Sequence, residues 1–86
     1  MEAYIIYENK EDRELLELIN SKFPIFIEYI NFNSKKDRKK ATRIKSHWAA
    51  RKNPFVELKE GDRTVKVFYS DGGENAVQQF VNYLCK

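Results

Sequence analysis

The sequence predicts a small α/β domain with the element order βαβαββα, in which a four-stranded mixed sheet carries helices on both faces. Two observations predict this class. Runs of β-branched and aromatic residues, typical of strands, alternate with segments whose apolar residues recur at helical spacing. In addition, the last two strand-like runs are separated only by a short turn, which favours an antiparallel hairpin after a parallel pair. With 86 residues, 42% of them hydrophobic, the chain is expected to form one domain over residues 1–86.

The first strand is expected at residues 3–7, which are apolar almost throughout. A strand without polar alternation is typical of the centre of a sheet, where both faces are buried. Asn9 is a suitable cap for a helix from about Lys10 to Lys22, and acidic residues follow it near the positive helix terminus. The helix is expected to present an apolar stripe to the core, formed by Leu15, Leu16, Ile19 and Phe23.

Pro24 ends this region, and residues 25–30 are β-branched and aromatic, which predicts a second strand. A strand, a helix and a strand in close succession indicate a right-handed parallel crossover. Ser34 is then a candidate cap for a second helix, expected roughly from Lys35 to Arg51. The apolar stripe of this helix is short and consists of Ala41, Ile44 and Trp48.

The second half of the domain is predicted to be a hairpin followed by a helix. Pro54 precedes a third strand at residues 55–59, and a turn at Gly61 joins it to a fourth at residues 64–69. The fourth strand alternates apolar and polar residues, which is typical of an edge strand. After a break at residues 70–73, the last helix carries one apolar face made of Ala76, Val77, Phe80, Val81 and Leu84.

Charge is distributed unevenly along the chain. The formal net charge is +3, yet residues 35–52 hold nine cations and only Asp37 as an acid, which makes this segment +8. The remaining residues hold seven cations and twelve acids, which gives −5. The second helix is therefore the candidate site for an acidic protein partner, or for nucleic acid or another polyanion. The candidate binding residues are Lys35, Lys36, Arg38, Lys39, Lys40, Arg43, Lys45, Arg51 and Lys52.

A charged run of this kind can also do no more than keep a helix solvated. As a nucleic-acid site, the cations would bind phosphates, and the nearby aromatic side chains of Tyr29, Phe32 and Trp48 are candidates for stacking on bases. No recognised nucleic-acid motif accompanies the run. An acidic protein surface is therefore the preferred partner, and nucleic acid is the alternative.

Two short motifs, taken with the element order, resemble a known family. Residues 53–56 (NPFV) stand before the hairpin and residues 70–73 (SDGG) before the last helix, which is similar to the glutaredoxin branch of the thioredoxin-fold superfamily. The resemblance covers most of the chain as topology. It implies a thioredoxin-like βαβαββα fold with a cis peptide bond before Pro54. It also implies a surface for glutathione or a peptide, formed by Asn53, Pro54, Asp71, Gly72 and Gly73.

The chain lacks the catalytic pair of that family. The Cys-x-x-Cys motif would fall at residues 7–12, where the sequence is acidic and has neither a cysteine nor a substitute serine. The lone Cys85 and the lone His47 provide no internal disulfide and no metal site. We therefore expect a protein without enzymatic activity, cofactor or metal.

The expected function is a non-catalytic interaction or assembly module that engages an acidic partner through its basic helix. The alternatives are nucleic-acid or polyanion binding through the same helix, and a degenerate glutaredoxin-like protein that still binds glutathione. The apolar runs are too short to cross a membrane and no signal peptide is recognised, so a cytoplasmic location is expected. Thioredoxin-like proteins without the cysteines are, by resemblance, frequent in phage genomes, which would place this one in a host cytoplasm or a virion.

Overall fold

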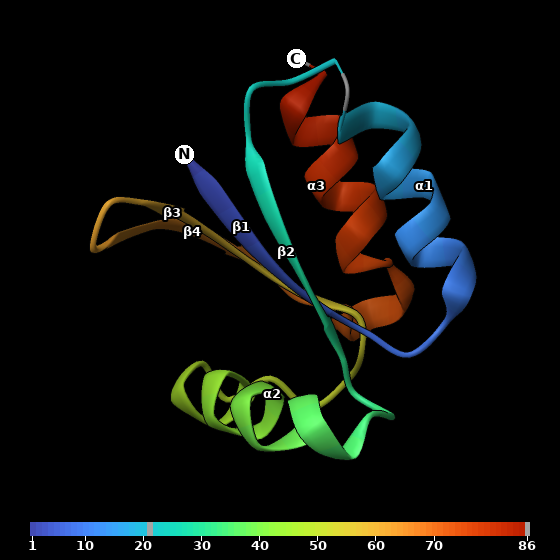
Figure 1. Ribbon diagram of the computed structural model, residues 1–86, viewed down its shortest axis with the longest axis vertical. Helices are drawn as coiled ribbons and strands as arrows, with labels where there is room; N and C mark the ends of the chain where they lie inside the picture. The colour runs from blue at the N-terminus through green and yellow to red at the C-terminus, as the bar shows by residue number, and fades with distance from the viewer. Residues whose placement is uncertain (21, 86) are drawn as a thin grey trace.

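The computed structural model describes residues 1–20 and 22–85 and has the predicted element order (Figure 1). The strands are β1 (Glu2–Tyr7), β2 (Phe26–Asn31), β3 (Phe55–Glu60) and β4 (Arg63–Phe68). The helices are α1 (Lys10–Asn20), α2 (Lys35–His47) and α3 (Ala76–Leu84), and a short 3-10 turn, η1 (Asp71–Gly73), precedes α3. The side chain of Ile19, predicted to lie on the apolar stripe of α1, falls outside what the structure describes.

The four strands form one mixed sheet in the order β2-β1-β3-β4. β1 runs parallel to β2, with Ile5 opposite Tyr29, and antiparallel to β3, with Ile5 opposite Val56. β3 and β4 form the antiparallel hairpin. The structure confirms that the apolar first strand is central and that the alternating fourth strand is an edge strand.

The sheet separates two apolar clusters, and helices cover both faces, as predicted. α1 and α3 lie side by side on one face, and α2 lies on the other (Figure 1). The cluster under α1 and α3 is the larger, and its buried members are Ala3, Ile5, Leu16, Val56, Leu58, Phe68, Ala76, Val77 and Phe80. The cluster under α2 has Ile6, Ile30, Ala41 and Phe55 as its buried members, with Ile44 and Trp48 packed against them.

The predicted length of α2 is wrong, because the helix ends at His47 and not at Arg51. Ala49 adopts a left-handed conformation with φ of 55°, which no helix can continue through. Its N–H donates to the Ser46 carbonyl at 3.3 Å, and the next N–H, of Ala50, donates to the Lys45 carbonyl at 2.8 Å. These two bonds form a Schellman cap. Arg51 and Lys52 consequently lie in the loop that leads to β3.

Two smaller expectations about helix ends also need correction. α1 ends at Asn20, two residues before the predicted Lys22. Ser34 occupies the cap position of α2, but its side chain makes no capping hydrogen bond. Its backbone carbonyl instead accepts bonds from the N–H groups of Asp37 and Arg38, at 3.1 and 2.9 Å.

Candidate functional site: the basic face of α2

The exposed side of α2 carries a row of cations directly opposite its packed side. Ala41, Ile44 and Trp48 hold the helix on the sheet. Because a helix brings residues three and four apart onto one face, the cations at other positions point away from that stripe. Five cations of α2 are exposed, and we call the four that lie opposite the packed side the basic stripe: Lys35, Lys36, Lys39 and Arg43.

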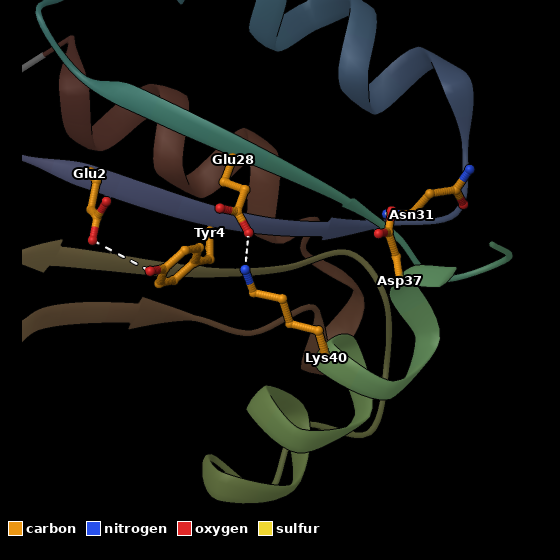
Figure 2. A network of polar contacts seen from close by, with 6 residues as sticks. All are labelled: Glu2, Tyr4, Glu28, Asn31, Asp37 and Lys40. Atoms are coloured by element: carbon orange, nitrogen blue, oxygen red, sulfur yellow. Dashed lines mark hydrogen bonds and ion pairs between the residues drawn. The ribbon is translucent and has the colours of Figure 1, made fainter. Parts of the chain in front are cut away.

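Lys40 is not part of this outward surface, because its side chain turns back to the sheet. Its ammonium forms an ion pair with Glu28 of β2 and lies 5.3 Å from the centre of the Tyr4 ring (Figure 2). In the same region, the Asp37 carboxylate accepts a hydrogen bond from the Asn31 backbone N–H at 3.2 Å. Both contacts fix the first turns of α2 to β2. Lys40 therefore contributes to the attachment of the helix to the sheet.

Lys45 is the most buried of the nine cations, with only 8% of its surface exposed. Its Nζ donates a hydrogen bond to Asn53 Oδ1 at 2.7 Å and lies 4.5 Å from the centre of the Phe32 ring. The Asn53 amide in turn donates to the Glu8 carboxylate. Burial lowers the pKa of Lys45, and the negative charge of Glu8 opposes this shift. Lys45, predicted as a binding residue together with the other cations, is therefore not part of the exposed basic surface.

The remaining cations of the segment differ in how firmly they are held. Arg38 is exposed, but its Nε donates to the Phe32 carbonyl at 3.1 Å and its guanidinium lies 5.2 Å from the Phe32 ring centre. Arg51 and Lys52 are exposed in the loop after the helix. The outward-facing set therefore consists of the basic stripe, with Arg38 on its flank and these two residues beyond its end.

The aromatic side chains proposed for base stacking are not presented beside the basic stripe. Tyr29 packs with the cluster under α1 and α3, on the far face of the sheet, where its ring meets Tyr7 edge-on. Trp48 packs on the cluster beneath α2. Phe32 is half-buried and has two cations close to its ring. The structure thus packs Tyr29 and Trp48 on the two faces of the sheet, whereas Phe32 keeps one exposed cation, Arg38, beside its ring.

The surroundings of Pro54 are compact. The Asn53–Pro54 peptide bond is cis, as the resemblance implied. Pro54 is buried, and its carbonyl accepts a hydrogen bond from Ser70 Oγ at 2.6 Å. The same hydroxyl oxygen accepts one from the Ala76 N–H at 3.0 Å, which joins the start of β3 to the start of α3.

The five residues of the predicted glutathione or peptide surface differ in how far they are exposed. Asn53 is held by Lys45 and Glu8, and Pro54 is buried, whereas residues 71–73 are exposed. A cavity of about 500 Å³ between α1 and α3 has Gly73 in its lining, but neither Asn53 nor Pro54. A ligand at this surface stays a prediction.

Over residues 1–20 and 22–85, no group of three or more His, Cys, Asp or Glu side chains is arranged to hold a metal ion. None of the described helices is long and apolar enough to cross a membrane. Cys85 is exposed at the end of α3.

Comparison of the chain with protein-family models, with curated proteins and with solved structures finds no match. The geometry of the chain itself must therefore carry any functional argument.

The sequence alone carries a signal that separates Lys45 from the other eight cations. Lys45 follows Ala41 by four residues and precedes Trp48 by three, so helical spacing places it on the packed side. No such signal identifies Asn53 as its partner, because that contact depends on how the loop after α2 returns to the sheet.

Proposed function

We propose that this protein is a non-catalytic binding module that recognises an acidic protein surface through the exposed face of α2. The observation that carries the proposal is the basic stripe. Four cations point to solvent from a helix whose opposite face is anchored in the core. A charged surface mounted on a rigid element loses little conformational freedom on binding beyond that of its own side chains.

The distribution of charge supports recognition by electrostatic attraction. The segment 35–52 is +8 and the other residues sum to −5, so the molecule is electrically two-sided. Such a separation orients an approaching acidic partner toward α2 and raises the association rate. The ion pair of Lys40 with Glu28 removes one cation from this field, whereas the basic stripe contributes in full.

A protein partner is preferred over single-stranded nucleic acid because base stacking would require aromatic rings beside the cations. Trp48 packs on the sheet, and Tyr29 lies on the opposite face. Phe32, the third candidate, is half-buried, and the cations at its ring are Arg38 and Lys45 and not those of the basic stripe. Duplex DNA is the competing ligand, because its phosphate backbone can bind cations without any base stacking on a protein ring. The binding measurement therefore includes a DNA duplex.

We further propose that the fold is of the thioredoxin type and has no redox function. The element order and the strand order support this, with a central β1 parallel to β2 and antiparallel to β3. The loop after β1 contains no thiol, and the single cysteine is at the far end of α3. An insulin-reduction assay should show no turnover, and measurable turnover would refute this part of the proposal.

The test is a binding measurement with fluorescent oligoglutamate and with a fluorescent DNA duplex, each by anisotropy at low and high salt. One variant replaces the basic stripe by glutamine (K35Q/K36Q/K39Q/R43Q). A matched control replaces three lysines and one arginine that are exposed elsewhere (K10Q/K22Q/R63Q/K66Q). Both variants lose the same charge, so a difference between them reports the position of the charge and not its amount.

We expect oligoglutamate to bind the wild type and the control, and the stripe variant to bind about tenfold more weakly or worse. Salt should weaken the wild-type complex, because exposed charges are screened over about 10 Å at 0.1 M ionic strength. Equal losses in the two variants would refute recognition by α2. If the wild type binds DNA but not oligoglutamate, the partner is a nucleic acid and the proposal of an acidic protein partner is refuted.

A further inference from the structure

A small polar cavity lies at the flank of α2, apart from the exposed cations of the basic stripe. A cavity of about 190 Å³ opens at the flank of the helix, lined by Phe32, Thr42, Lys45, Ser46 and Ala50. Two of these residues bring hydroxyl groups, and one brings a buried ammonium. The lining therefore offers hydrogen-bond donors to an acceptor group that enters from the solvent.

The Lys45 ammonium is only partly satisfied by the protein. An ammonium has three N–H donors, and one of them goes to Asn53 Oδ1. Glu8 approaches this charge through the Asn53 amide and not directly. Within residues 1–20 and 22–85, Lys45 forms no ion pair of its own, and its burial lowers its pKa. A buried cation in this condition is stabilised by any anion that reaches it.

A second positive charge reinforces the first. The Arg38 guanidinium lies over the same Phe32 ring that faces the Lys45 ammonium, and it too forms no ion pair within the described part of the chain. The nearest acid on the helix, Asp37, is already bonded to the Asn31 N–H. The cavity thus has one cation in its lining, Lys45, a second cation, Arg38, close to the lining residue Phe32, and no carboxylate among its lining residues.

We propose that this cavity holds the carboxylate of one aspartate or glutamate side chain of the acidic partner, which accepts hydrogen bonds from Lys45 and from the Thr42 and Ser46 hydroxyls. This inference rests on the proposed function and adds a fixed contact to it. The basic stripe attracts the partner, and the cavity sets where it docks.

The experiment combines acetate titration with the oligoglutamate assay. In NMR spectra of the wild type, acetate should shift the signals of Thr42 and Ser46 and raise the pKa of Lys45, because a bound anion offsets the effect of burial. Thr42→Val should weaken oligoglutamate binding about threefold to tenfold, and Thr42→Ser, which keeps the hydroxyl, should restore it. Lys45→Met should weaken binding about tenfold, with Lys66→Met, a cation on β4, as the matched control.

The outcomes separate this inference from the proposed function. If the stripe variant loses binding while Thr42→Val and Lys45→Met bind as well as the wild type, the cavity has no role in binding. The proposed binding function of α2 is then still supported. If the wild type does not bind oligoglutamate, both are refuted. Inorganic phosphate that shifts Thr42 and Ser46 where acetate does not would overturn the carboxylate in favour of a phosphate group. Because Thr42 is exposed, its variants remain informative even if Lys45→Met folds poorly.

Discussion

Replacing Lys45 by methionine tests whether a buried cation helps to hold α2 on the sheet. Methionine keeps the unbranched stem and removes the ammonium. The change deletes the hydrogen bond to Asn53 Oδ1 and the contact with the Phe32 ring, 4.5 Å away. A hydrogen bond to a charged group contributes about 1.5–3 kcal/mol, and a cation–ring contact contributes about 0.5–2 kcal/mol.

The same substitution also has a stabilising effect, because it removes a buried charge from the folded protein. Lys45 is 8% exposed, and burial disfavours its charged form, so an apolar side chain of similar length avoids that cost. We expect the two effects to leave a net loss of about 1–2 kcal/mol in the free energy of unfolding at pH 7. In a domain of this size, each kcal/mol lowers the melting temperature by about 4–8 °C. Lys39→Met, at an exposed position, should change stability by less than about 0.5 kcal/mol.

The pH dependence gives this prediction its sharpest test. The folded-state pKa of Lys45 lies below its unfolded value, so between the two values the unfolded chain binds more protons at this residue. The stability of the wild type therefore rises with pH in that window, and the variant lacks the group. We expect the difference in unfolding free energy, measured by urea titration, to be larger near pH 10 than at pH 7. A difference that shrinks as pH rises, or a variant as stable as Lys39→Met, would refute the reasoning.

Three further changes test the fold by thermal and urea unfolding. Ala49→Gly should raise stability by about 0.5–1 kcal/mol, because Ala49 has φ of 55° at the helix cap, where alanine is strained; a loss would contradict the left-handed assignment. Phe80→Ala should cost about 3–5 kcal/mol, because Phe80 is fully buried and meets the Phe68 ring edge-on; a cost under 1 kcal/mol would place it outside the core. Asn75→Ala should cost about 1 kcal/mol, because its side chain accepts bonds from the Val77 and Gln78 N–H groups, and Asn75→Ser should recover most of that loss.

The sequence predicted the layers, the central first strand and the edge position of the fourth strand, because all three follow from apolar periodicity. Residues 3–7 have no polar alternation, and this strand is central. The stripe of Ala41, Ile44 and Trp48 placed α2 on the sheet in the correct orientation. Such patterns report burial, which is the largest contribution to folding and is visible in a single chain.

The end of α2 and the division of its cations could not be predicted in the same way. Position 49, where the helix cap needs a left-handed residue, is alanine and not glycine, so the sequence shows no end of the helix there. The sequence therefore predicts a helix that continues to Arg51. Lys40 meets Glu28 twelve residues away, and Asn53 meets Glu8 across 45 residues. Contacts of this kind are created by the return of the chain in space and leave no periodic signal.

The exposed cations of the basic stripe and the buried Lys45 should affect different rate constants of partner binding. Charges on the basic stripe act at a distance and are screened by salt, so neutralising them should mainly lower the association rate. A carboxylate bound at Lys45 would lose its hydration and make short hydrogen bonds, so removing the ammonium should mainly raise the dissociation rate. Stopped-flow measurements with oligoglutamate can resolve the two. If Lys45→Met and the stripe variant both changed only the association rate, Lys45 would be one more steering charge, and a fixed contact at the flank of α2 would have to be abandoned.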